Sequence, residues 1–220
     1  ELNLNRINLS KSWEGKLPEG EHSIYEIQNG KEWYCYLLKR WVDQEVNPDS
    51  LFVFGKQEVK FVKEKMDQIK SNLQFTNEEF ETHLQGSFLF ITDVNTVQKQ
   101  FEEAQERIKS KLVGLFPYTD QIEDAKISQG TNSNLAQVPA FYDSGTFYYN
   151  YFDKPYIKRQ IEWIYAHEAF PGHHYQGAVN ELIKRSEIQN LFWYPGFVEG
   201  WGAYVEYLDF YSSPMDEYGK

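Results

Sequence analysis

The feature that most constrains this chain is a short stretch, Ile164–Gln176, that combines histidines, a glutamate and a proline–glycine pair. Three of the five histidines, His167, His173 and His174, lie within eight residues, and Glu168 directly follows the first of them. Imidazoles gathered beside a carboxylate are typical of a zinc site with a nearby base. The fold must therefore bring side chains of this one segment to a common point.

The spacing differs from the common zinc-peptidase signature His-Glu-x-x-His, in which histidines at positions i and i+4 share one face of a helix. Four residues after His167 stands Pro171, which cannot bind a metal. On an undistorted helix His173 would be rotated by about 240° from His167, and His174 would lie about 10.5 Å farther along the axis. Because proline breaks the hydrogen-bond ladder and glycine permits unusual dihedral angles, we predict that Pro171 and Gly172 kink or bulge the helix. That distortion would swing a later histidine back toward the first.

A second acidic signal, Glu199, follows downstream in the sequence Phe-Val-Glu-Gly-Trp. Our interpretation is a site with two imidazoles and one carboxylate as ligands of a single zinc ion, Zn2+. Manganese or cobalt are alternatives for such a ligand set. Glu168 would act as the general base on a metal-bound water, in the manner of a zinc hydrolase.

Helical spacing of apolar residues dominates the first half of the chain. One helix is predicted over residues 31–42, and a long helix from the Asn47-Pro48-Asp49 start signal to about Asn72. The long helix is expected to bury a stripe made of Leu51, Val53, Phe54, Val59, Phe61, Val62, Met66 and Ile69.

Two further helices are predicted before the period changes. A capping box at residues 76–79 starts a short one. A long one, capped by Asp93 or Asn95, should reach Val113 and stop at Gly114.

The helical period is lost between about residues 116 and 153. The segments 125–128, 140–143 and 146–152 are short, rich in aromatic or β-branched residues and separated by glycines. They predict a small antiparallel sheet or hairpin. In zinc peptidases a strand edge near the metal lets an extended substrate pair its backbone with the protein. An ordinary β insertion is the alternative.

Three helical stretches are predicted after this β element. Asp153 and Pro155 can start the helix that carries His167, and a second helix should run from His173 to about Ile188. The last helix follows Pro195-Gly196 and bears Glu199, Tyr204, Glu206 and Leu208.

The composition argues against nucleic-acid binding, an intrachain disulfide and a membrane-spanning segment. A formal net charge of −11 without a basic stripe argues against nucleic-acid binding. A single cysteine, Cys35, excludes an intrachain disulfide. No apolar run of about 18 residues could span a membrane. We expect a soluble protein, and its compartment is open between the bacterial periplasm, a lipoprotein-derived location and the cytoplasm.

The motif His-Glu-Ala-Phe-Pro-Gly-His-His-Tyr-Gln, followed by Glu-Gly-Trp-Gly-Ala-Tyr-Val-Glu, resembles the "domain of unknown function 885" family. Members of that family are mainly bacterial, are regarded as zinc metallopeptidases, and are similar in arrangement to gluzincins. The similarity covers roughly residues 30–210 and is sharpest from Phe141 to Leu208. Members are usually longer, so we expect the chain to be a piece of a longer protein.

The resemblance implies a mainly helical fold with a small β element before the metal helix. It implies His167 and His173 as ligands, because the histidine directly after Pro-Gly matches the family's ligand position. It further implies Glu199 as third ligand and Glu168 as catalytic base. His174 would then be a neighbour of the site, and Glu206 would either orient a ligand imidazole or lie on the surface.

These observations predict a chain organised as an irregular lead-in (1–30), a helical region (31–115) and a catalytic-type region with the β element and metal-site helices (116–220). The expected function is a zinc metallopeptidase acting on a peptide substrate. A catalytically silent, metal-stabilised domain that binds peptides or a partner is one alternative, and a hydrolase of non-peptide amides or esters is another. End-trimming or internal cleavage, and any oligomeric state, stay open.

Overall fold

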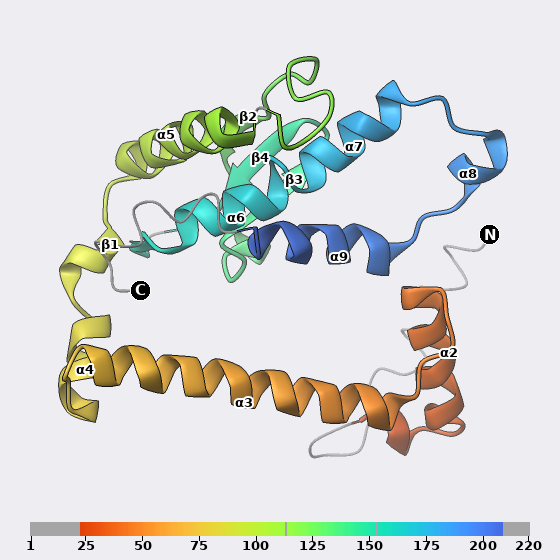
Figure 1. Ribbon diagram of the computed structural model, residues 1–220, viewed down its shortest axis with the longest axis horizontal. Helices are drawn as coiled ribbons and strands as arrows, with labels where there is room; N and C mark the ends of the chain where they lie inside the picture. The colour runs from red at the N-terminus through yellow and green to blue at the C-terminus, as the bar shows by residue number, and fades with distance from the viewer. Residues whose placement is uncertain (1–22, 113, 153, 209–220) are drawn as a thin grey trace. The chain divides into compact units, whose positions relative to one another are not determined.

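The computed structural model is mainly helical, as the sequence predicts, and it contains two small sheets (Figure 1). It divides into two compact units, Glu1–Phe54 and Gly55–Lys220, whose boundary falls inside the long helix α3. The described residues are 23–112, 114–152 and 154–208. Most of the predicted irregular lead-in therefore lies outside the described residues. Among the described residues, no helix combines the length and apolar character needed to cross a membrane.

The first unit contains the 3-10 helix η1 (Ile24–Glu26) and the helix α2 (Gly30–Val42), which confirms the helix predicted over 31–42. Gly30 packs so tightly that a Cβ atom there would lie 1.7 Å from the carbonyl oxygen of Ile24. Only glycine permits this close approach of the two backbones.

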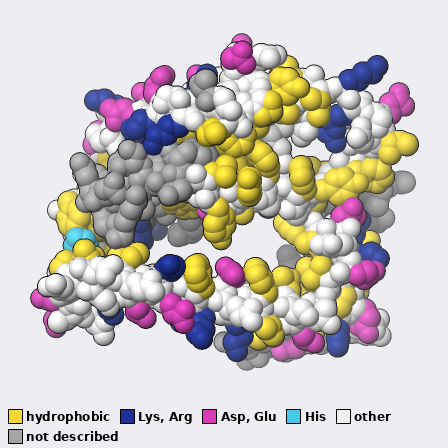
Figure 2. Space-filling view, in the orientation of Figure 1, with side chains coloured by type: hydrophobic (Ala, Val, Ile, Leu, Met, Phe, Trp, Pro, Cys, Tyr) yellow, Lys and Arg dark blue, Asp and Glu magenta, His cyan; other side chains and the backbone are white. Residues whose placement is uncertain are grey.

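Helix α3 (Pro48–Asn72) has the predicted bounds. The side chain of Asn47 caps it by accepting hydrogen bonds from the backbone N–H groups of Asp49 at 2.9 Å and Ser50 at 3.1 Å. The predicted burial of its apolar stripe is wrong, because none of its residues is buried. Figure 2 shows hydrophobic side chains at the surface along this helix, and Phe54 of the predicted stripe is 56% exposed. Helical periodicity identifies side chains that share a face, but burial also needs a covering surface.

The next two helices confirm their predicted start signals. Helix α4 (Asn77–Leu84) begins with a complete capping box between Thr76 and Glu79. After η2 (Ser87–Leu89) and β1 (Phe90–Ile91), helix α5 (Val94–Leu112) is capped by Asp93, which accepts from the Thr96 backbone N–H at 2.7 Å. Val113 lies outside the described residues, and Gly114 follows at a φ of 83°.

The predicted β element is a three-stranded sheet in the order β2-β4-β3. Its strands are β2 (Lys126–Gln129), β3 (Ala140–Asp143) and β4 (Thr146–Tyr149). The β3–β4 hairpin is antiparallel, as predicted, and turns at Gly145 with a φ of 82°. Strand β2 instead pairs parallel to β4. The segment between β2 and β3, which contains η3 (Ser133–Leu135), reverses the direction of the chain, and the β3–β4 turn reverses it again, so β2 and β4 run in the same direction.

A second, unpredicted sheet pairs β1 with β5 (Tyr156–Ile157) in antiparallel fashion. Because Ile157 belongs to this strand, the helix expected from Pro155 begins later, as α6 (Gln160–Glu168). Asp153 lies outside the described residues.

The remaining helices are α7 (His173–Leu182), α8 (Glu187–Leu191) and α9 (Pro195–Glu206). The stretch predicted to reach Ile188 is therefore two helices, because Ser186 and Gln189 form a capping box that starts α8. Leu208 lies beyond the end of α9 rather than within it.

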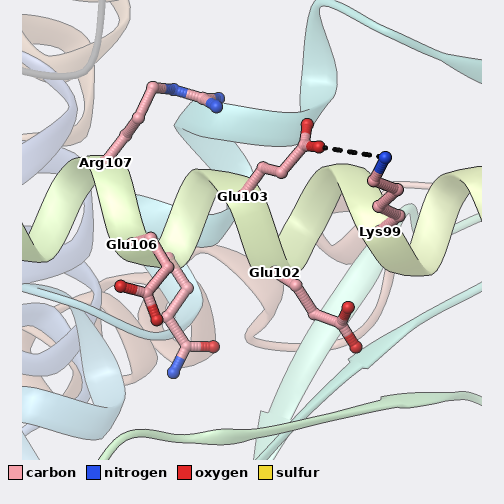
Figure 3. A pocket seen from close by; sticks show the side chains of 6 residues that line it. Lys99, Glu102, Glu103, Glu106 and Arg107 are labelled. Atoms are coloured by element: carbon pink, nitrogen blue, oxygen red, sulfur yellow. Dashed lines mark ion pairs between the residues drawn. The ribbon is translucent and has the colours of Figure 1, made fainter.

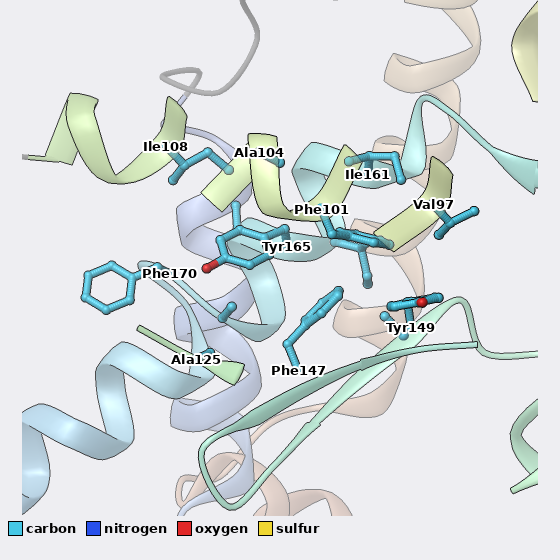
Figure 4. Packing of buried hydrophobic residues seen from close by; sticks show 14 of the residues in the cluster. Val97, Phe101, Ala104, Ile108, Ala125, Phe147, Tyr149, Ile161, Tyr165 and Phe170 are labelled. Carbon is cyan, nitrogen blue, oxygen red and sulfur yellow. The ribbon is translucent and has the colours of Figure 1, made fainter. Parts of the chain in front are cut away.

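The core of the second unit lies between α5, α6 and the three-stranded sheet, as Figure 4 shows. Five residues of α5 form a fully buried stripe: Val97, Phe101, Ala104, Ile108 and Leu112. The Phe101 ring contacts the Phe147 ring of β4 at a centroid distance of 4.7 Å, and Phe147 contacts Tyr165 of α6 at 5.4 Å. This packing holds α6, which carries His167 and Glu168, in a fixed place.

Candidate metal centre

The predicted distortion between His167 and His173 is confirmed as a break between two helices. Helix α6 ends at Glu168, and Ala169 leaves the helical region with φ and ψ of −109° and −94°. Helix α7 begins at His173. A Cβ atom on Gly172 would lie 1.7 Å from the carbonyl oxygen of His167, so the returning chain passes where only glycine fits.

The break brings three predicted ligands together. His167 is contributed by the end of α6, His173 by the start of α7 and Glu199 by α9. A carboxylate oxygen of Glu199 lies 3.9 Å from Nε2 of His167 and 3.6 Å from Nε2 of His173. The two imidazole rings are nearly perpendicular, with centroids 4.9 Å apart.

These distances suit a zinc ion. With metal–ligand distances of about 2.1 Å, the ligand atoms of a tetrahedral zinc site lie about 3.4 Å apart. The three ligand atoms here all lie within 4.8 Å of one another, and among the described residues no other trio of His, Cys, Asp or Glu side chains meets so closely. Two nitrogens and one carboxylate oxygen leave a fourth position for water or substrate, which is the composition of a catalytic zinc site.

The second ring nitrogen of His167 is held by Glu206. Its Nδ1 lies 2.6 Å from a carboxylate oxygen of Glu206, two turns after Glu199 on α9. This contact decides between the two roles left open for Glu206, because the carboxylate orients a candidate ligand. Such a partner fixes the tautomer in which Nε2 is free for the metal.

Gly202, between Glu199 and Glu206 on the same helix, lets α9 approach the His167 ring. A Cβ atom on Gly202 would lie 2.7 Å from both Cε1 and Nε2 of that ring. Nothing in the apolar periodicity singles out Gly202, and the only sequence signal is a second glycine three residues after Glu199. The helix is further anchored where the indole N–H of Trp201 donates to the carbonyl of Pro171 at 2.7 Å.

Glu168 lies beside this group and differs from the other carboxylates in its environment. Burial raises its pKa to about 7, although the neighbouring His167 and the backbone N–H of Tyr142 both act to lower it. Burial likewise lowers the pKa of His173. A carboxyl group that titrates near neutral pH is suited to accept and return a proton. The Tyr142 N–H is a contact that no sequence signal predicts.

The raised pKa of Glu168 gives a testable pH dependence for the metal-free chain. The folded pKa of about 7 exceeds the ordinary value of 4.5, so between these pH values the folded chain retains a proton that the unfolded chain releases. The free energy of unfolding therefore falls as pH rises through this window. We expect a loss on the order of 2 kcal/mol, discounted for partial exposure.

The comparison of wild type with Glu168→Gln isolates this effect. His173 contributes with the opposite sign, because a lowered histidine pKa makes stability rise with pH, but both proteins share that contribution. In urea unfolding without metal, the variant should gain stability relative to wild type as pH increases from 5 to 8. A difference that is constant over this range would contradict the assigned burial of Glu168.

His174 does not join the candidate ligands. It is buried, at 8% exposure, and both ring nitrogens contact other groups: Nε2 lies 2.8 Å from the carbonyl oxygen of Glu123, and Nδ1 lies 3.1 Å from the Tyr142 hydroxyl. Of the two histidines after Pro171, the structure therefore brings only His173 to His167 and Glu199.

A shallow depression lies on the outer face of α5, away from the candidate ligands (Figure 3). It is lined by Lys99, Glu102, Glu103, Gln105, Glu106 and Arg107. Lys99 pairs with Glu103 at 3.6 Å, and Arg107 binds Glu162 of α6. Its cations are thus engaged by neighbouring acids, and it resembles an ordinary solvated helix face.

Comparison with known proteins gives a family without a described activity. A family model described as "Bacterial protein of unknown function (DUF885)" matches residues 10–220. No curated protein matches the chain.

Proposed function

Because the chain belongs to the DUF885 family of bacterial proteins of unknown function, we propose a function from the chemistry of its site: a zinc-dependent hydrolase, in the first place a metallopeptidase. The observation that carries the proposal is the convergence of His167, His173 and Glu199 beside a partly buried carboxyl group, Glu168. This combination of two imidazoles, one carboxylate and an adjacent base matches the requirements of metal-assisted hydrolysis.

Each protein group has a distinct part in this proposal. His167, His173 and Glu199 would hold a zinc ion, which in a site of this composition would acidify a coordinated water and polarise a substrate carbonyl. Glu168 receives the proton of the attacking water and delivers it to the leaving amine. In the metal-free chain burial raises its pKa to about 7, a range in which a carboxyl group can both accept and release a proton near neutral pH. Glu206 keeps the His167 ring oriented through the contact at Nδ1.

The edge of strand β3 favours a peptide as substrate. β3 is the outer strand of the order β2-β4-β3, and its residue Tyr142 lies beside Glu168. An extended peptide that added to this edge would pass the candidate base. The edge therefore supports the peptidase over a hydrolase of esters or small amides.

Metal content and turnover test the proposal together. We expect the chain to bind close to one zinc ion per molecule, as measured by plasma mass spectrometry, and to cleave members of a mixed peptide library analysed by mass spectrometry. The His167→Ala variant should lose both properties, because it removes a ligand.

Two other outcomes would point to the alternatives. Zinc binding without cleavage would favour a metal-stabilised domain that binds peptides or a partner. Absence of bound zinc in the folded wild type would remove the basis for any metal-dependent hydrolase.

A further inference from the structure

His174 stands directly after a candidate ligand, yet it takes part in a separate hydrogen-bonded chain. Its Nε2 lies 2.8 Å from the Glu123 carbonyl oxygen, which can only accept, so Nε2 carries the proton. In the neutral imidazole Nδ1 is then an acceptor, and the Tyr142 hydroxyl donates to it at 3.1 Å. The same hydroxyl oxygen accepts from the Gly145 backbone N–H at 2.9 Å. We refer to this chain of contacts as the Tyr142–His174 bridge.

The bridge joins three segments around the site. His174 belongs to the first turn of α7, Tyr142 to strand β3, and Gly145 to the turn between β3 and β4. The Tyr142 and His174 rings also pack edge to face, with centroids 5.4 Å apart. The bridge therefore fixes the β3–β4 hairpin to the helix that begins with His173.

The backbone of Tyr142 makes the contact that matters for the site. The Asn150 N–H donates to the Pro139 carbonyl at 2.9 Å, which marks positions 139 and 150 as a hydrogen-bonded pair. Hydrogen-bonded pairs alternate with non-hydrogen-bonded pairs along an antiparallel ladder. Phe141 and Tyr148 therefore form the next hydrogen-bonded pair, and the N–H of Tyr142 points away from β4. That N–H instead faces Glu168, where it acts to lower the pKa of the carboxyl group.

We propose that His174 and Tyr142 are positioning residues for Glu168: the bridge fixes strand β3 so that the Tyr142 N–H holds the Glu168 carboxylate at the metal centre. The functional part rests on the proposed function, because it assumes that Glu168 is the base. The structural part, the coupling of the bridge to the Tyr142 N–H, stands on its own.

A space-filling role alone would not require this arrangement. Buried polar groups lower stability unless they are hydrogen-bonded, and apolar rings would occupy the same volume without that penalty. Here the donors and acceptors of Tyr142, His174, Gly145 and Glu123 match in one continuous order. Such matched networks specify one arrangement of the segments they join.

Four variants separate the bridge from general packing. Tyr142→Phe keeps the ring but removes the hydroxyl. His174→Gln places an amide donor near the position of Nε2 and removes the acceptor at Nδ1, whereas His174→Asn places an amide oxygen near Nδ1 and retains an acceptor for Tyr142. Tyr148→Phe is the matched control, because Tyr148 lies in the same hairpin and its ring stacks on Phe141.

The first readout is amide hydrogen exchange measured by NMR, which does not depend on activity. Tyr142→Phe and His174→Gln should each accelerate exchange of the residue 142 amide about tenfold, because its contact to Glu168 loosens. The Phe141 amide should stay protected within the hairpin. His174→Asn and Tyr148→Phe should exchange at residue 142 like wild type, and the Tyr142→Phe/His174→Gln double variant should exceed neither single variant.

The second readout is the split of kinetic constants on a cleaved peptide. Both bridge-breaking variants should lower kcat about tenfold while KM and zinc content stay within twofold of wild type. Loss of zinc from His174→Gln would overturn the proposal by making His174 a ligand. Unchanged exchange at residue 142 in both folded variants would overturn it as well. If wild type binds zinc but cleaves nothing, the proposed function fails, and the exchange readout alone decides whether the bridge holds the Tyr142 N–H.

Discussion

Replacing Glu168 with glutamine is expected to lower hydrolysis by about 100- to 10,000-fold while leaving the zinc content unchanged. The amide has almost the same shape as the carboxyl group but cannot accept the proton of the attacking water, and general-base catalysis is typically worth a factor in this range. Because Glu168 is not one of the three candidate ligands, the metal should remain bound. Turnover is measured by mass spectrometry of quenched time points, and zinc content is measured by plasma mass spectrometry.

The control for this experiment is Glu181→Gln, which makes the same change of charge at an exposed position of α7. It should hydrolyse peptides at the wild-type rate and keep its metal. Should Glu168→Gln retain wild-type turnover, the base has been misassigned. Should it lose zinc together with activity, Glu168 is a ligand and the assigned roles must be exchanged.

A methyl group added at Gly202 should have the second large effect, on metal binding rather than on proton transfer. The new Cβ would lie 2.7 Å from two atoms of the His167 ring, so either the ring or α9 must move. Since α9 also carries Glu199 and Glu206, either movement separates groups that have to stay in register. We expect Gly202→Ala to weaken zinc affinity about 10- to 100-fold, which is the range seen when the hydrogen-bonding partner of a ligand imidazole is lost.

Gly200 offers a matched control two residues earlier in the same helix. A Cβ atom there meets nothing within 4 Å, so Gly200→Ala should preserve zinc affinity. It should also raise stability by about 0.5–1 kcal/mol, because alanine favours the helix. Competition with a chromogenic chelator and thermal unfolding measure the two effects. Equal affinities of Gly202→Ala and Gly200→Ala would contradict the close contact between α9 and His167.

Local signals predicted the helices well because capping and periodicity are properties of neighbouring residues. Asn47, Thr76 and Asp93 each cap the helix that follows them. The burial of these helices was less predictable, because it depends on what covers a face. The stripe of α5 is fully buried, whereas no residue of the comparable stripe of α3 is buried. The parallel pairing of β2 likewise depends on the path of the intervening segment.

In the candidate site, too, local features could be predicted from the sequence, whereas contacts between separate elements could not. The presence of Pro171 and Gly172 predicted a break, but the choice between the two following histidines depends on backbone angles at Ala169 and Gly172 that spacing does not determine. The contact between Glu206 and His167 depends on how closely α9 crosses α6, which Gly202 permits. The approach of the Tyr142 backbone N–H to Glu168 had no signal in the sequence at all, since every residue except proline offers an N–H.

The unequal exposure of the three candidate ligands has a consequence for the binding and release of a metal ion. The side chains of His167 and His173 are 16% and 14% exposed, whereas Glu199 is 52% exposed. Release and capture should therefore proceed through the carboxylate, which can swing outward while both imidazoles stay in place. The rates of metal binding and release would then depend on the rotation of one side chain. A mutation that restricts the rotation of the Glu199 side chain would slow both processes without altering which ion is preferred.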